Sequence, residues 1–253
     1  MHVLFAFGVL LCAAQAQEFN YDQHGADWEG LCATGSSQSP ISIRRPTRVS
    51  DVYQPLIVAN ADSVEYTVSE EVDTYRLTAP QPASTLTAVL IGESAPTTFT
   101  LNNIHFHSTS EHRVRGQVFD LEMHMVHYGP NGARAVLGVF YYISYSRSPL
   151  LDSIMQGGAL NIAAELGSTI NDFYFYSGSL TTPPCTEPVN WFLPRFGSEV
   201  GLSATQDQID WVAGQWDQNQ GYARNNRQTQ PLNGRTVYEF IAPDSTSYLN
   251  SSS

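Results

Sequence analysis

The stretch Thr97–His112, TTFTLNNIHFHSTSEH, joins a run of β-forming residues to three of the chain's seven histidines. Side chains of a β-strand alternate between its two faces, so His105 and His107 share one face and Phe106 lies on the other. In a helix the two histidines would lie about 200° apart and could not hold one metal ion. The spacing therefore predicts a strand that presents a pair of imidazoles on one face.

A second run of β-forming residues, Asp120–His127 (DLEMHMVH), carries two further histidines. The alternation predicts one face with Glu122, His124 and Val126 and an opposite face with Met123, Met125 and His127. If the two strands are antiparallel neighbours, His124 completes a triangle with His105 and His107. Three imidazoles without a fourth protein ligand are typical of a catalytic zinc site. For His105 and His107 alone a structural pair remains the alternative, and the third histidine favours the metal site.

Two polar residues are placed to orient these histidines. Metal-bound histidines usually give their second ring N–H to a carboxylate or an amide. Glu122 stands two residues before His124, and Asn103 stands two residues before His105. We therefore expect Glu122 and Asn103 to support the site from behind.

The remaining histidines receive other interpretations. His112 and His127 are expected to be hydrogen-bonded structural residues. A helical pairing of His124 with His127, three residues apart, is disfavoured by the β-forming residues around them. His24 lies in a loop-like N-terminal stretch and carries no interpretation of its own.

The rest of the chain is also rich in short strands separated by Pro, Gly, Asn or Asp, which favours a mainly β domain. The predicted strands, besides 97–107 and 120–127, are 63–68, 74–78, 135–143, 189–192 and 236–241. Helical signals are few. Ser148–Gln156 begins with Ser-Pro, which is typical of an N-cap followed by the first helical residue, and Gln206–Trp216 has an apolar stripe of helical period. No internal repeat or long linker divides the chain, so we expect one domain.

Composition limits the partners. The 253 residues carry a net charge of −12, and all twelve basic residues are arginines. Nucleic acids and anionic membrane surfaces attract basic proteins, so neither is an expected partner.

The N-terminus predicts export. Val3–Cys12 is an apolar run too short to span a bilayer, and Ala14-Gln15-Ala16 follows as a cleavage pattern. We expect residues 1–16 to be a signal peptide and residues 17–253 to form the mature, secreted domain. A buried N-terminal strand is the alternative. No other stretch predicts a membrane helix, and the C-terminus lacks a hydrophobic tail for a lipid anchor.

The cysteines agree with export. Cys12 would leave with the signal peptide, and Cys32 and Cys185 would remain as an even pair in an oxidising compartment. In the chain-entropy model, a disulfide that closes so long a loop stabilises a protein by roughly 3–5 kcal/mol. Two separate buried thiols are the alternative.

Several segments together resemble the α-class carbonic anhydrases, in that family's order and over about residues 19–240. They are QSPISI, HFHSTSEH, LEMHMVHYG, AVLGVF, GSLTTPPCTEPVNW and NNRQTQPLNGR. The segment HSTSEH is more similar to plant-like and bacterial members than to vertebrate ones. The resemblance implies one domain around a large, mostly antiparallel, twisted central sheet with short peripheral helices. It also implies reversible hydration of CO₂ to bicarbonate and a proton by zinc-bound hydroxide, with hydrolysis of small esters as a side activity.

The resemblance assigns roles to particular residues. His105, His107 and His124 match the zinc ligands. Thr181 matches the threonine that accepts a hydrogen bond from the zinc-bound hydroxide, and Glu111 matches the glutamate that orients this threonine. The expected CO₂ pocket consists of Val126, Val136, Leu180, Thr182 and Trp191. Cys32 and Cys185 match the disulfide of secreted members.

Two positions depart from the family pattern. Fast members carry a histidine as proton shuttle, but the matching segment Ile57–Tyr66 contains none, and Asp62 falls closest to that position. An ordinary aspartate has a pKa of about 3.9, which makes it a poor proton relay at neutral pH. Asn103 stands where many members have the longer Gln, which could loosen the support of His105. The main alternative to the enzyme is a catalytically dead relative that serves as a binding or adhesion module, and such relatives usually lose a zinc ligand.

Overall fold

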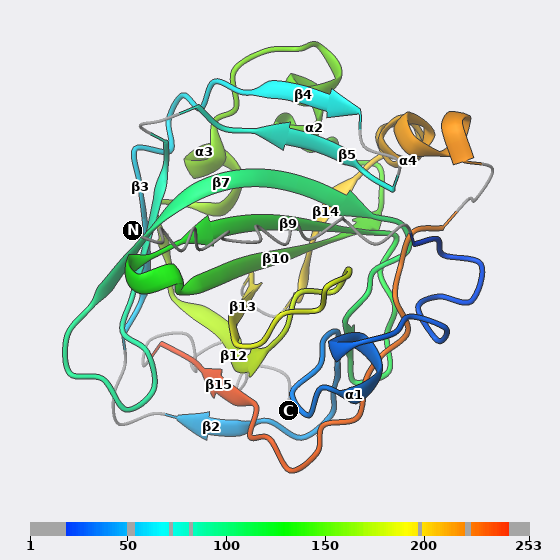
Figure 1. Ribbon diagram of the computed structural model, residues 1–253. Helices are drawn as coiled ribbons and strands as arrows, with labels where there is room; N and C mark the ends of the chain where they lie inside the picture. The colour runs from blue at the N-terminus through cyan, green and yellow to red at the C-terminus, as the bar shows by residue number, and fades with distance from the viewer. Residues whose placement is uncertain are drawn as a thin grey trace, which may run out of the picture.

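One sheet of 13 strands dominates the computed structural model, which describes residues 19–49, 54–70, 73–80, 83–196, 199–220 and 224–242 (Figure 1). Its strands are β2 (Thr47–Val49), β3 (Leu56–Ala59), β4 (Thr67–Glu70), β5 (Tyr75–Thr78), β6 (Thr85–Ala88), β7 (Thr97–His107), β9 (Leu121–Tyr128), β10 (Arg134–Ile143), β11 (Thr169–Ile170), β12 (Asp172–Gly178), β13 (Val189–Arg195), β14 (Gly201–Ala204) and β15 (Tyr238–Phe240). The main path runs β11-β3-β6-β7-β9-β10-β13-β12-β15-β2. A separate two-stranded sheet pairs β1 (Ser42–Ile43) with β8 (Arg113–Val114).

The long strands β7, β9 and β10 cross the middle of the molecule (Figure 1). β7 pairs antiparallel with β9, and β9 pairs antiparallel with β10, so the expected neighbourhood of the two histidine-bearing strands is confirmed. Within the described part of the large sheet, parallel pairing joins β10 to β13 and β14, and β15 to β2. The sheet is therefore mostly antiparallel, as predicted.

A β-bulge at Asn102 divides strand β7 into two halves. The pairing shifts between Leu101, opposite His127, and Asn103, opposite Val126. Before the bulge, odd-numbered side chains such as Leu101 enter the core; after it, the even-numbered Ile104 does so. One extra residue on a strand changes which side chains face which side. The bulge therefore turns both histidines of β7 away from the core.

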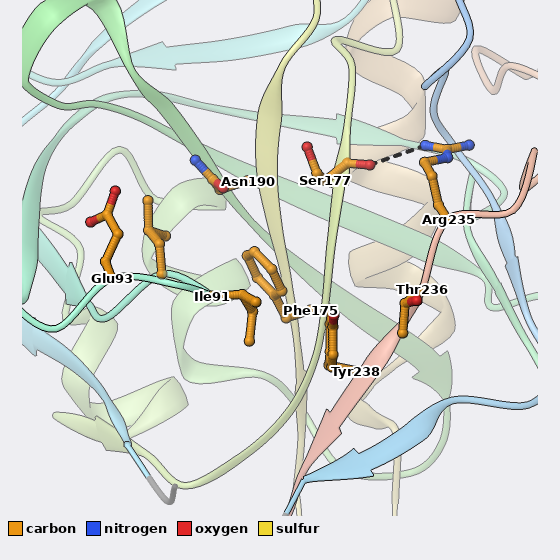
Figure 2. A pocket seen from close by; sticks show the side chains of 9 residues that line it. Ile91, Glu93, Phe175, Ser177, Asn190, Arg235, Thr236 and Tyr238 are labelled. Atoms are coloured by element: carbon orange, nitrogen blue, oxygen red, sulfur yellow. Dashed lines mark hydrogen bonds between the residues drawn. The ribbon is translucent and has the colours of Figure 1, made fainter.

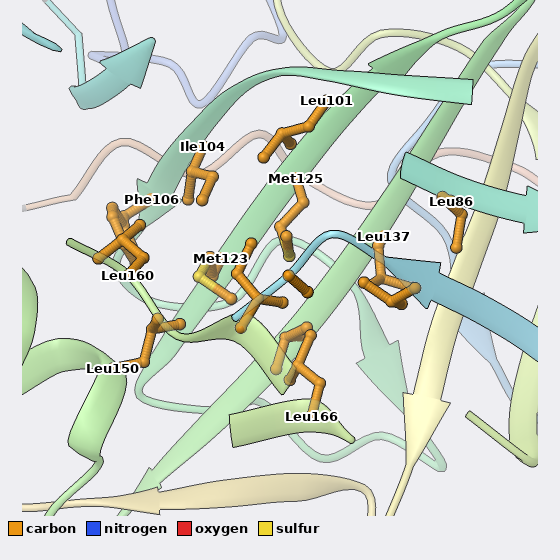
Figure 3. Close-up of a cluster of buried hydrophobic side chains, with 14 of the residues drawn as sticks. Leu86, Leu101, Ile104, Phe106, Met123, Met125, Leu137, Leu150, Leu160 and Leu166 are labelled. Atoms are coloured by element: carbon orange, nitrogen blue, oxygen red, sulfur yellow. The ribbon is translucent and has the colours of Figure 1, made fainter. Parts of the chain in front are cut away.

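The main hydrophobic core fills the face of the sheet opposite those histidines (Figure 3). Side chains from β7 and β9, such as Phe106 and Met123, pack there against Leu150 and Leu160 from the helical side. The helices are α1 (Leu31–Thr34), α2 (Pro149–Met155), α3 (Ile162–Leu166), α4 (Gln206–Gln220) and the 3₁₀ turn η1 (Pro130–Gly132). Helices α2, α3 and α4 lie on this side (Figure 1). A second apolar cluster, which includes Val126, Val136 and Trp191, lies on the histidine-bearing face.

The local predictions fared differently. Strand 97–107 has the predicted bounds, and the Ser148 hydroxyl caps α2 by accepting a hydrogen bond from the Leu151 N–H at 3.1 Å. The prediction of a strand over 63–68 was wrong, because that strand begins only at Thr67. Val64 instead exchanges backbone hydrogen bonds with Leu160 in an isolated bridge, which ties this segment to the helical layer.

A disulfide joins Cys32, in α1, to Cys185, which lies 153 positions further along the chain. The buried Arg227 lies beside it and donates to the Cys32 carbonyl oxygen at 2.7 Å. Among the described residues, no helix is long and apolar enough to cross a membrane. The expected signal peptide, residues 1–16, lies outside the described residues.

Candidate metal centre and active site

Three histidine side chains converge on the face of the sheet away from the main core. His105 on β7 stands directly opposite His124 on β9, and His107 follows two residues along β7. The ring centroids lie 5.1 Å apart for His105 and His124, 5.2 Å for His105 and His107, and 4.5 Å for His107 and His124. One nitrogen from each ring lies within 4.8 Å of the others. The structure thus forms the expected triangle.

Each of the three rings is held by its other nitrogen. His105 Nδ1 lies 2.9 Å from Asn103 Oδ1, and His107 Nδ1 lies 2.8 Å from the backbone oxygen of Asn225. His124 Nε2 lies 2.7 Å from Glu122 Oε1. These oxygens accept hydrogen bonds, so each ring carries its N–H there and turns its lone pair toward the other two rings. Asn103 and Glu122 thus occupy the positions expected of them.

The donor set fits a zinc ion. His107 Nε2 is buried and has no hydrogen-bond partner within the described chain, as expected of a ligand atom described without its metal. Burial lowers the pKa of His107 to about 4 and lowers the pKa of His105 and His124 as well, so all three rings are neutral at pH 7. Neutral imidazoles are the form that binds metals. Three such ligands leave a fourth tetrahedral position for water or substrate.

A second group of possible ligands, His112, Glu122 and His124, is better described as a hydrogen-bond network. Glu122 Oε1 lies 2.7 Å from both His112 Nδ1 and His124 Nε2, so both ring nitrogens donate to it and offer no lone pair to an ion. Its Oε2 accepts the backbone N–H groups of Glu111 and His112, each at 2.8 Å. Burial would raise the pKa of Glu122, but the two histidines together hold it well below its usual range. Glu122 is therefore an anion that fixes His124.

The network gives His112 and His127 the structural roles predicted for them. His112 Nε2 contacts the Tyr176 hydroxyl at 2.6 Å, so both ring nitrogens of His112 are used. His127 points to the opposite face of β9, where its Nδ1 donates to the Met125 carbonyl oxygen at 2.8 Å. Both residues are fully enclosed and lie outside the triangle.

Gly138 makes room for this arrangement on β10. It stands opposite His124 in the sheet. A Cβ at this position would lie 2.6 Å from Leu193 Cδ2 and 3.3 Å from Glu122 Oε1. A larger residue would push directly against the carboxylate that orients His124.

Glu111 and Thr181 lie beside the triangle. Glu111 Oε2 is 3.6 Å from His107 Nε2 and 4.0 Å from His124 Nδ1, and Oε1 accepts the Arg227 backbone N–H at 2.8 Å. Burial raises the pKa of Glu111 to about 7, while a hydrogen bond from the Thr181 hydroxyl is one of the effects that oppose the rise. Only one carboxylate oxygen has a fully formed hydrogen bond among the described residues, so the other faces Thr181 and the histidines.

A cavity of about 210 Å³ opens over these residues. Its lining includes all five residues expected to form a substrate pocket: Val126, Val136, Leu180, Thr182 and Trp191. Val126, Val136 and Trp191 form one cross-strand row over β9, β10 and β13, so they make a continuous apolar wall. Arg76, Asn103, His105 and Thr181 line the same cavity and give it a polar side. One half of the cavity is therefore apolar and the other half bears the ligands.

A larger cavity, of about 390 Å³, lies elsewhere on the molecule (Figure 2). Its floor is apolar, with Ile91, Phe175 and Tyr238, and Glu93 and Arg235 stand at its edges. Arg235 already donates to the Ser177 carbonyl oxygen at 3.2 Å. No histidine lines this cavity, so it is not the candidate active site.

The residues considered for proton transfer lie elsewhere. Asp62 is exposed and is not part of the cavity lining, while its neighbour Ala61 accepts the backbone N–H of Ile162 at the helical layer. His24 Nδ1 lies 2.9 Å from the backbone oxygen of Asn226 and is also absent from the lining. The structure brings neither side chain to the histidine triangle.

Asn225 and Arg76 are among the residues at the site that were not predicted. Asn225 supports His107 through a backbone oxygen, and its side chain accepts the Ser108 N–H at 2.9 Å. A backbone acceptor leaves no signature in a sequence. Arg76 lines the cavity from β5. Its alternation with the buried Leu77 indicates that the two side chains lie on opposite faces of β5. The pairing of β5 with β7, which brings Arg76 to the site, could not be inferred from the sequence.

Comparisons with known proteins agree with the fold. The family model for eukaryotic-type carbonic anhydrase matches residues 23–241. A carbonic anhydrase of Neisseria gonorrhoeae is 32% identical over 219 residues, which cover 83% of this chain and 79% of the relative. Alpha carbonic anhydrase 3 of Arabidopsis thaliana is 32% identical over 226 residues, which cover 84% of this chain and 77% of the relative.

A solved structure extends the likeness. The alpha-carbonic anhydrase from Thermovibrio ammonificans, in complex with the inhibitor sulfanilamide, matches with a TM-score of 0.66 and 30% identity and covers 82% of this chain and 89% of that one. The chain belongs to the eukaryotic-type carbonic anhydrase family. Its relatives and its fold identify it as a carbonate dehydratase, the class that interconverts CO₂ and bicarbonate.

Proposed function

We propose that this chain hydrates CO₂ reversibly at a zinc ion held by His105, His107 and His124. The observation that carries the proposal is the convergence of three neutral imidazoles whose other nitrogens are all hydrogen-bonded. Bound there, zinc supplies a Lewis acid that makes a water-derived nucleophile available at neutral pH; carbonic anhydrase is itself the standard example of this effect. Because the ligands are neutral, the full charge of the ion remains available for that chemistry.

Thr181 orients the nucleophile. Thr181 is buried, and its hydroxyl interacts with Glu111. An ionised carboxylate has no hydrogen to donate, so Glu111 in that form acts only as the acceptor. The threonine proton is then committed to Glu111, and the threonine oxygen is left as an acceptor toward the cavity. Glu111 is held in turn by the Arg227 N–H. The nucleophile is thus oriented through a chain of directed hydrogen bonds.

The apolar wall holds CO₂. The molecule has no net charge and forms only weak hydrogen bonds, so Val126, Val136 and Trp191 can bind it without competing with water for polar partners. Leu180 lies next to Thr181, and Thr182 completes the lining. CO₂ therefore rests beside the oriented nucleophile, with its carbon accessible to attack.

Zinc removal tests the proposal. We expect the purified protein to contain one zinc per chain and to hydrate CO₂ in a stopped-flow assay, and we expect a chelator to abolish both properties and added zinc to restore them. Hydrolysis of a small ester should follow the same pattern at a lower rate, because the same nucleophile attacks a carbonyl carbon. A zinc-free protein without activity would support the alternative of a binding module, which the intact histidine triangle disfavours.

Proton release should limit turnover. Outside the histidine triangle, the described residues that line the cavity include no group that ordinarily titrates near neutral pH. We expect turnover at low buffer concentration to rise when imidazole is added. The value of kcat/KM for CO₂ should stay unchanged, because it reports steps before the proton leaves. Asp62→Asn should leave turnover unchanged, because Asp62 is exposed and does not line the cavity. Native turnover that is already insensitive to buffer would contradict this expectation.

We also propose that the chain is exported after cleavage near Ala16. The Cys32–Cys185 disulfide supports this, because such bonds persist in oxidising compartments. N-terminal sequencing of the protein recovered outside the cell should begin near Gln17, and a retained apolar run would contradict the proposal.

A further inference from the structure

Arg76 brings a fixed positive charge to the candidate active site. It stands on β5 directly opposite His105 on β7, and residues paired in this way have their side chains on the same face of the sheet. One cross-strand row therefore runs from Arg76 through His105 and His124 to Gly138. The side chain of Arg76 is half-buried and lines the cavity.

Asn103 holds the guanidinium in place. Arg76 Nη1 donates to Asn103 Oδ1 at 3.0 Å, and the same oxygen lies 2.9 Å from His105 Nδ1. The Asn103 amide nitrogen donates to Asn102 Oδ1 at 2.9 Å, which fixes the amide from its other end. A guanidinium group has no acceptor, so the shared contact fixes the oxygen of Asn103 toward both partners. The shorter side chain at this position therefore does not leave His105 unsupported.

We propose that Arg76 forms an anion-binding subsite that favours bicarbonate and other small planar or linear anions beside the metal. The inference rests on the proposed function, because the anion would lie between the guanidinium and the zinc ion. The two substrates of the reaction differ in charge: CO₂ is neutral and meets the apolar wall, whereas bicarbonate is an anion. A planar guanidinium matches the carboxylate-like edge of bicarbonate.

Direct binding of azide and of imidazole to the zinc-loaded protein tests the subsite. Azide is an anion and imidazole is a neutral metal ligand, so the ratio of their affinities measures charge selectivity. Calorimetric titration of Arg76→Gln should show azide binding weakened on the order of tenfold, with imidazole binding unchanged. The variant keeps an amide that can donate to Asn103. Arg76→Lys, which keeps the charge, should stay within a few-fold of the native protein. Bicarbonate should follow azide.

Arg44→Gln is the matched control, because it removes the same charge from an exposed position away from the cavity and should leave all affinities unchanged. Zinc content and thermal unfolding establish that each variant is folded and loaded; if Arg76→Gln fails these checks, Arg76→Met takes its place with the same expected ratio. Equal azide affinity in the native protein and an active, zinc-loaded Arg76 variant would overturn this inference alone. A native protein that binds no zinc would overturn the proposed function as well.

Discussion

His124→Ala should leave a folded protein that binds little zinc and has almost no CO₂ hydration activity. The variant loses one of three ligands, and it also leaves Glu122 without the ring that accounts for part of its low pKa. Activity should fall by several orders of magnitude, because the uncatalysed reaction lacks the activated nucleophile. Zinc content by mass spectrometry, stopped-flow hydration and circular dichroism measure the three parts of this result.

His127→Gln is the matched control. It changes a buried histidine on the opposite face of the same strand, and the new amide can still donate to the Met125 carbonyl oxygen. This variant should retain zinc and activity. Near-native hydration by His124→Ala would remove the three-histidine site from consideration, whatever its zinc content.

Thr181→Ala should retain zinc but hydrate CO₂ about ten- to a hundredfold more slowly, because a hydrogen bond to a charged group contributes roughly 1.5–3 kcal/mol. The substitution removes both the acceptor for the nucleophile and the donor to Glu111. The loss should appear in kcat/KM, since the orientation is needed in the transition state. Thr181→Ser retains the hydroxyl and should recover most of the rate. Equal rates for the alanine variant and the native protein would show that Thr181 has no orienting role.

The mainly β class could be predicted from the density of short β-forming runs, and the histidine triangle from the period of two near the ligands. In Asn103–His107 and Leu121–His127 this period fixes the face of every ligand, and the structure places both segments in strands. The single large antiparallel sheet was implied by the resemblance. Glu122 and Asn103 lie two residues from the histidines they support, so the same period predicted them. Local spacing is sufficient when both partners belong to one strand.

The other parts of the site depend on contacts between distant segments. Asn225 approaches His107 from 118 residues away, and it does so with a backbone oxygen. Arg76 reaches the cavity because β5 pairs with the second half of β7, while β6 pairs with the first half. Nothing in the residues of Tyr75–Thr78 specifies that choice of partner. The link from Glu111 to Thr181 was predictable only through the family resemblance. The link from Glu111 to the Arg227 backbone was not predicted at all.

The bulge at Asn102 has a consequence for protein engineering. Strand β7 obeys one alternation up to Leu101 and the reverse alternation from Asn103 onward. A regular strand of the same composition would turn His105 and His107 into the main hydrophobic core and turn Ile104 and Phe106 toward the face that holds the site. Placing only the three histidines on another sheet would therefore omit the bulge that turns them toward the site. The segment to transfer is Leu101–His107. Its bulge residue, Asn102, determines which side chains face the metal site and which pack in the hydrophobic core.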